Sequence, residues 1–167
     1  MERILYGKPI AEELDGKSKL VFTNYENAND RKPKLTAITV GDNPASLLYV
    51  SRKEEKAIEL GVEFNWIKLN KETSQKDLEE KVKLSAKDSD GIIIQLPLPE
   101  HIKPEEAINK IPYNLDVDGL TALNLGNLYS EQYKIIPATS LAILEIIRFY
   151  KIDTTDKNIV IAGRSRL

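Results

Sequence analysis

The sequence predicts an α/β fold in which helices cover both faces of a parallel sheet, giving three layers. Two observations favour this fold. Apolar runs with the spacing of strands alternate along the 167 residues with amphipathic stretches that have the spacing of helices, which is typical of right-handed βαβ units. Ile92, Ile93 and Ile94 form a continuous β-branched run, which suits a strand that is buried on both faces.

Each expected element has its own local signal. Apolar residues at helical spacing predict helices, and short β-branched or alternating runs predict strands. In chain order we expect a helix over 10–25, a turn over 27–33, a strand over 35–40, a helix over 46–60, a strand over 62–69, a helix over about 74–87, the strand over 92–94 and a short helix over 104–111.

Capping residues and turn formers support these boundaries. Gly41-Asp42-Asn43-Pro44 is a strong loop signal after the first strand. We expect Ser46 to be the N-cap of the next helix and Gly61 to follow its C-terminal end. Ser74, with Asp77 three residues later, resembles a capping box at the start of the third helix.

A second structural unit is expected near the end of the chain. Residues 139–150 predict a helix whose apolar face is broad enough to be buried between two bodies, and residues 158–162 predict a strand. Because a first parallel strand needs a crossover and a partner strand, we expect the chain to be a fragment; otherwise this strand pairs as an edge elsewhere. The domain boundaries expected on this basis are 1–136, 137–157 and 158–167.

The composition excludes several classes of function. The net charge of −2 gives no reason to expect a nucleic-acid partner. The absence of cysteine excludes disulfides, thiolate metal sites and a cysteine nucleophile. No apolar run approaches the roughly 20 residues that span a bilayer, and no signal peptide is visible. We therefore expect a cytoplasmic protein without a membrane partner.

Polar side chains at two places could carry chemistry. Gln95 follows the buried strand, and open α/β sheets bind ligands at the carboxyl ends of their strands; alternatively, its amide only caps local backbone. Tyr49 and Lys53 are four residues apart and share one helix face. An ammonium beside a phenol and an amide could move protons, although the pair could also be an ordinary part of a charged, exposed face.

Asp116-Val117-Asp118-Gly119 is a third candidate segment. Its two carboxylates lie on one side of an extended chain, and Gly119 permits a sharp turn. A carboxylate that accepts two parallel hydrogen bonds suits an amino-pyrimidine edge, whereas the spacing does not fit an EF-hand; a plain Asp turn remains the alternative. His101, the single histidine, lacks triad spacing and is expected to be structural or solvated. We expect no metal site.

Together these segments resemble the bifunctional methylenetetrahydrofolate dehydrogenase/methenyltetrahydrofolate cyclohydrolase family. The resemblance runs from about Leu5 to Ser165 in the family's order. The segments that carry it are Val40-Gly41-Asp42-Asn43-Pro44-Ala45-Ser46, Tyr49-Val50-x-x-Lys53, Gly91-x-x-x-Gln95-Leu96-Pro97-Leu98-Pro99, Asp116-Val117-Asp118-Gly119-Leu120, Pro137-Ala138-Thr139 and Gly163-Arg164-Ser165.

The resemblance implies a catalytic α/β domain followed by an NADP-binding Rossmann domain, with folate bound between them in a homodimeric enzyme. It implies oxidation of methylenetetrahydrofolate by NADP and hydrolysis of the methenyl product to formyltetrahydrofolate. The resemblance implies that Lys53 is the catalytic lysine and that Tyr49 and Gln95 assist it and also bind the substrate. Leu96, Pro97 and Asp118 are further implied substrate-binding residues, with Asp118 at the pterin edge. The implied cofactor-binding residues are Gly163, Arg164 and Ser165.

The chain departs from the family pattern at several places. Leu115 stands where a lysine is common, and residues 137–142 lack a cysteine, a proline and a glycine of the usual pattern. Because little follows Ser165, we expect hydride transfer to be lost and cyclohydrolase activity to be weak. The alternatives are a non-catalytic folate-binding or assembly subunit and the substrate domain of another two-domain nicotinamide dehydrogenase.

Overall fold

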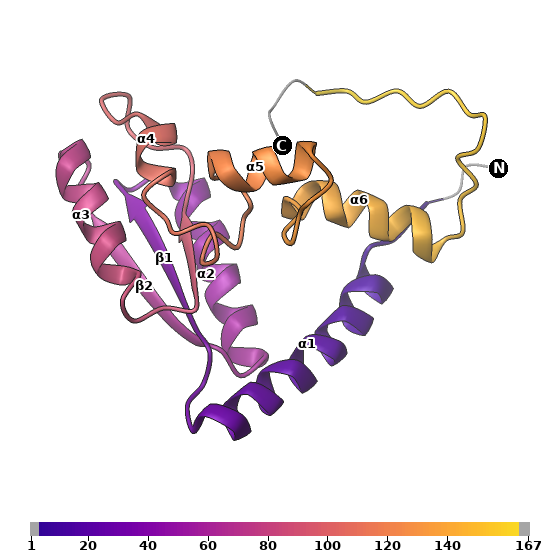
Figure 1. Ribbon diagram of the computed structural model, residues 1–167, viewed down its shortest axis with the longest axis horizontal. Coiled ribbons are helices and arrows are strands. Elements are labelled where there is room, and N and C mark those ends of the chain that lie inside the picture. The colour runs from indigo at the N-terminus through magenta and orange to yellow at the C-terminus, as the bar shows by residue number, and fades with distance from the viewer. Residues whose placement is uncertain (1–3, 164–167) are drawn as a thin grey trace.

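The computed structural model, which describes residues 4–163, contains a parallel sheet with helices on both faces (Figure 1). The elements are α1 (Lys8–Asn29), β1 (Lys34–Val40), α2 (Pro44–Glu59), β2 (Glu63–Leu69), α3 (Gln75–Ser85), β3 (Gly91–Ile94), α4 (Pro104–Ile108), α5 (Ala122–Tyr129) and α6 (Ala138–Phe149).

The sheet has the order β2-β1-β3, and all of its pairs are parallel. Ala37 in the central strand pairs with Trp66 on one side and with Ile93 on the other. A single parallel bridge between Ile92 and Asp116 extends β3 at its outer edge. The predicted α/β fold with a parallel sheet is therefore confirmed.

Two hydrophobic clusters cover the two faces of the sheet. Ile38, Ile92 and Ile94 pack with a group from the α3 and α4 side that includes Leu78, Val82 and Ile108. Ala37 and Ile93 pack on the opposite face against Val50 of α2. Neighbouring residues of a strand point to opposite faces, so β1 and β3 need apolar side chains at successive positions.

The start of α2 differs from the prediction. Ser46 is not the N-cap: the helix begins at Pro44, and the Asn43 side chain accepts a hydrogen bond from Ser46 N at 3.1 Å. Proline suits the first helical position because its missing N–H would have no partner there, so the cap lies directly before Pro44. The Gly61 and Ser74 predictions are confirmed, since Gly61 has φ +85° after the helix end and Ser74 caps α3.

The strand expected near the end of the chain is absent from the described residues. Residues 158–163, the last that the structure describes, contain no strand, and Val160 is 92% exposed. The strand predicted over 158–162 is wrong here because no neighbouring strand within residues 4–163 supplies its hydrogen bonds. α6, described in full, has no buried residue in this structure, although its apolar face is broad enough to be buried between two bodies.

α1 and α6 are joined at one end. α1 runs away from the sheet, and its N-terminal end meets α6 (Figure 1). The Tyr150 hydroxyl accepts a hydrogen bond from Tyr6 N and donates one to Tyr6 O, both at 3.0 Å. Among the described helices, none is long and apolar enough to cross a membrane.

Candidate functional site

Lys53 and Gln95 meet at the carboxyl end of the sheet. Gln95 follows β3 directly, and its backbone N donates to Ile38 O at 2.9 Å, which holds it beside β1. Its side-chain Nε2 donates to Leu96 O at 2.8 Å, which leaves Oε1 to accept a hydrogen bond from Lys53 Nζ at 3.2 Å. The carboxamide is therefore oriented with its oxygen toward the lysine on α2.

Asp118 lies in the same cavity as this pair. The cavity has a volume of about 320 Å³, within the usual size range of small-molecule sites. Its lining residues are Lys53, Ile94, Gln95, Leu96, Asp118, Leu120, Pro137, Ala138 and Thr139. The fold thus brings together three polar residues that the sequence singled out separately, and it places them where α/β sheets bind ligands.

The surroundings of Asp118 change its acidity. Burial raises the pKa of the Asp118 carboxyl above its ordinary value, nearby Lys53 opposes this rise, and Asp116 adds to it. Burial disfavours the charged form of a carboxyl group. A ligand that donates hydrogen bonds to Asp118 would favour its carboxylate, so this residue suits a ligand with N–H groups along one edge.

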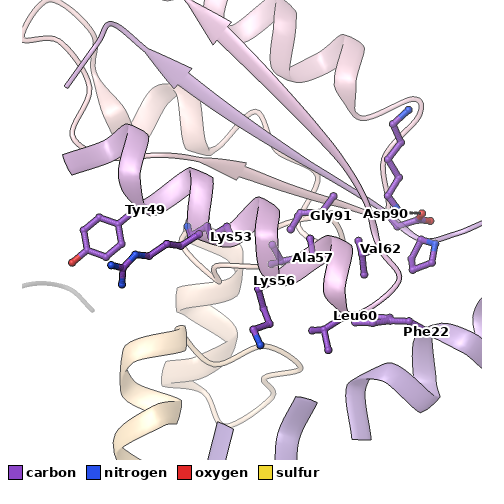
Figure 2. A pocket seen from close by; sticks show the side chains of 14 residues that line it. Phe22, Tyr49, Lys53, Lys56, Ala57, Leu60, Val62, Asp90 and Gly91 are labelled. Carbon is purple, nitrogen blue, oxygen red and sulfur yellow. Dashed lines mark hydrogen bonds between the residues drawn. The ribbon is translucent and has the colours of Figure 1, made fainter. Parts of the chain in front are cut away.

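Tyr49 borders a second, larger cavity. Its side chain is 64% exposed on α2, one turn before Lys53, whose side chain lines both cavities. Figure 2 shows the two residues beside this cavity of about 540 Å³. Its other lining residues are mainly apolar groups and basic groups, including Phe22, Leu35, Ala57, Leu60, Val62 and Val117, and Lys34, Arg52 and Lys56.

The other predicted site residues are more widely spread. Leu96 lines the cavity that holds Gln95, whereas Pro97 lines a separate depression with Gly41 and Lys71. The Leu96–Pro97 peptide bond is cis. Gly163 is exposed, and its expected partners in the cofactor turn, Arg164 and Ser165, lie outside the described residues.

Part of the cavity wall was not predicted. Leu120 and the segment 137–139 at the start of α6 line the cavity together with Ile94 of β3. Their only signal was the resemblance of the segments 116–120 and 137–139 to the family, because contacts so far apart in sequence have no local pattern. Among residues 4–163, no cluster of three or more His, Asp or Glu could hold a metal ion. His101 lies outside the cavity, with Nε2 2.9 Å from Thr73 O, which agrees with a structural role.

Comparison with known proteins supports a common origin with folate enzymes. The sequence family "Tetrahydrofolate dehydrogenase/cyclohydrolase, catalytic domain" matches residues 5–118. The Bifunctional protein FolD of Streptococcus sanguinis is 37% identical over 169 residues, which cover 100% of this chain and 60% of that protein. The mitochondrial bifunctional methylenetetrahydrofolate dehydrogenase/cyclohydrolase of Gallus gallus is 32% identical, covering 98% of this chain and 49% of that protein.

Solved structures of folate enzymes are also similar to this chain. The bifunctional FolD enzyme from Campylobacter jejuni matches with a TM-score of 0.92 and 30% identity, covering 98% of this chain and 59% of that one. The Trypanosoma brucei methylenetetrahydrofolate dehydrogenase-cyclohydrolase, solved with NADP and an inhibitor, matches with a TM-score of 0.91 and 27% identity, covering 99% and 58%. The chain spans between 49% and 60% of the length of these relatives.

Proposed function

Because this chain belongs to the tetrahydrofolate dehydrogenase/cyclohydrolase family, we propose that its cavity at the sheet edge binds a tetrahydrofolate derivative and catalyses one-carbon chemistry on it. The observation that carries this proposal is the contact of Lys53 with Gln95 in a cavity that also contains Asp118. An amine, an amide and a carboxylate provide a proton carrier, an orienting group and an acceptor for a heterocyclic N–H edge.

The proposed roles follow from the position of each side chain. Asp118 accepts hydrogen bonds from the amino-pyrimidine edge of the pterin, since its carboxyl lies inside the cavity. Gln95 holds the Lys53 amine through Oε1. Tyr49, on the same face of α2, lines the larger cavity together with Lys53 and would contact an aromatic part of the substrate.

Lys53 would act as the proton carrier in the cyclohydrolase step. Water adds to the methenyl carbon between N5 and N10, and its oxygen forms the new C–O bond while it loses a proton to the Lys53 amine. The bond from that carbon to N5 then breaks, with its electron pair remaining on N5. Lys53 returns a proton to N5, the second proton of the water leaves to solvent, and the product is 10-formyltetrahydrofolate.

NADP is the proposed hydride acceptor of the dehydrogenase reaction, because the matched relatives are named dehydrogenases and the Trypanosoma brucei structure holds NADP. Within the described residues, the expected cofactor turn is represented by Gly163 alone, which is exposed and has no atom nearby where a side chain would lie. Gly163, Arg164 and Ser165 therefore stay the proposed cofactor turn on the family resemblance alone.

Loss of methenyltetrahydrofolate absorbance, followed without nucleotide, tests the proposed function. The unmodified chain should exceed the uncatalysed rate, and Lys53→Ala should remove the excess. Lys76→Ala is the matched control, since Lys76 is an exposed lysine on α3 outside the cavity. Equal rates for the unmodified chain and Lys53→Ala would contradict the proposal; folate binding by both without turnover would instead indicate a binding subunit.

Two sequence-based expectations remain as proposals. We propose a homodimer, which light scattering after size-exclusion chromatography would test through the mass of the particle. We also propose a cytoplasmic location, although some relatives carry mitochondrial names; cell fractionation with an antibody against this chain would test it.

A further inference from the structure

We propose that Asp116 is a positioning residue that, together with Asn124, holds Asp118 in the cavity. This inference rests on the proposed function because it assigns Asp118 to the folate. Asp116 and Asp118 are two residues apart, yet they have different surroundings. Asp118 lines the cavity, whereas Asp116 is 1% exposed and does not line it.

The Asp116 carboxylate ties the start of α5 to the sheet edge. Its Oδ2 accepts hydrogen bonds from Thr121 N at 2.8 Å and from Asn124 Nδ2 at 2.9 Å. Asn124 is also buried, and its Nδ2 donates to Tyr113 O at 2.9 Å. Because protein donors already occupy this buried oxygen, Asp116 does not present it to a substrate, and its contacts are those of a support.

The segment between these contacts forms a closed turn with Asp118 inside it. Gly119 N donates to Asp116 O at 3.3 Å, and Gly119 has φ +70°, in the left-handed region that favours glycine. Thr121 then caps α5, because its Oγ1 accepts from Asn124 N at 3.3 Å. The two ends of the turn are thus bound to each other through the Asp116 side chain.

The same turn is fixed relative to Gln95. Ile92 N donates to Leu115 O at 2.7 Å, and Ile92 and Asp116 form a parallel bridge. Gln95 is three residues after Ile92 and directly follows β3. The strand therefore sets the position of Gln95 directly and that of Asp118 through Asp116, so loss of the Asp116 carboxylate should release Asp118 without moving Gln95.

A double-mutant cycle tests the inference. We would titrate 5-formyltetrahydrofolate, as a non-reacting probe, into the full 167-residue chain and its variants. Asp116→Ala should weaken binding by about tenfold, because it releases the segment that carries a charged hydrogen-bond acceptor. In the Asp118→Ala chain the same change should cost less than about twofold, since a residue that acts only through Asp118 has nothing left to position. Asp116→Asn should restore most of the affinity, because its carboxamide oxygen can accept both hydrogen bonds.

Amide exchange on the unliganded chain provides a readout that needs no folate. Asp116→Ala should speed exchange of the Gly119 amide by about tenfold or more, because the turn then opens locally. Ser74→Ala, which removes the cap of α3 at a distance from the cavity, should leave Gly119 unchanged. If the chain does not bind 5-formyltetrahydrofolate but Asp116→Ala speeds exchange of the Gly119 amide, the proposed function is refuted and the positioning role is supported. Unchanged Gly119 exchange, or equal affinity losses with and without Asp118, would overturn the inference.

Discussion

Lys53 Nζ and Gln95 Oε1 are 3.2 Å apart although 42 residues separate them in the sequence. The parallel pairing of β1 and β3 explains this contact, since it brings the carboxyl end of β3 close to the helix that follows β1. The backbone bond from Gln95 N to Ile38 O fixes the amide at that edge. The lysine therefore has an acceptor whose position depends on the sheet and not on a mobile loop.

Gln95→Leu removes this acceptor while keeping a side chain of similar size. We expect kcat of the cyclohydrolase reaction to fall by about 100-fold, because a small misplacement of a reacting group has an effect of that order. KM should change much less, since Asp118 still binds the pterin. Initial rates over a range of methenyltetrahydrofolate concentrations measure both constants. Gln132→Leu, at an exposed glutamine, is the control; an unaltered kcat in Gln95→Leu would refute the orienting role.

Asp118→Asn should stabilise the fold while weakening folate binding. Burial raises the pKa of Asp118, so between its ordinary and raised pKa the folded chain holds more protons than the unfolded chain. The free energy of unfolding then decreases as the pH rises through this window. Asparagine does not titrate, and the variant should therefore melt at a higher temperature at pH 7, with a smaller difference below about pH 4. Melting curves at several pH values measure this; a lower melting temperature at pH 7 would contradict it.

Asp90→Asn should destabilise the fold at pH 7, in contrast to Asp118→Asn. Asp90 accepts two hydrogen bonds from Arg31, at 2.7 and 2.8 Å, and one each from the Tyr25 hydroxyl and Lys34 N, both at 2.8 Å. The Arg31 guanidinium in particular holds the pKa of the Asp90 carboxyl well below its usual range. The carboxylate thus stabilises the fold above the ordinary carboxyl pKa, and this contribution is lost as the pH falls toward the lowered value.

At pH 7 the Asp90→Asn variant should lose about 2 kcal/mol of unfolding free energy, the size expected for hydrogen bonds to a charged group. Urea unfolding at pH 7 and at successively lower pH measures this loss, which should shrink below about pH 4. Asp42→Asn serves as the control, since Asp42 is a loop carboxyl that is not among the partners of Arg31 and Asp90. A loss that stays constant down to low pH would show that the negative charge is not responsible.

The hydrophobic pattern predicted the sheet and most helices. In β1 and β3, burial on both faces requires apolar residues at successive positions, and this run is visible in the sequence. The pattern failed for α5, where Gly126 and two asparagines weaken the helical signal, and for residues 158–162, where strand propensity alone does not form a strand without a neighbour. The residues of the candidate site also fall into a predicted group and a missed group. Lys53 and Gln95 were found from their positions on single elements, whereas Leu120 and the start of α6 were missed because only the tertiary fold brings them to the cavity.

The Val117 side chain, at the centre of the Asp116–Gly119 turn, lies close to the backbone of Gly91. A Cβ atom at Gly91 would lie 2.7 Å from Val117 Cγ1 and 3.3 Å from Leu35 Cδ1, which is too close for the first contact. Val117 stands between the two aspartates of the segment, so a side chain at Gly91 requires the Val117 side chain to shift, and we expect this shift to disturb the turn. We therefore expect the absence of a side chain at this position to help place Asp118.

Gly91→Ala should lower the unfolding free energy by about 1–3 kcal/mol, as overpacking commonly does, and should also weaken binding of 5-formyltetrahydrofolate. Adding Val117→Ala should restore binding, because it removes the atom that the new methyl group meets. Gly126→Ala is the control: within the described chain its Cβ would meet nothing within 4 Å, and alanine is the better helix former there. Urea unfolding and calorimetric titration of the variants measure both effects, and a double variant that binds no better than Gly91→Ala would show that the turn is held in another way.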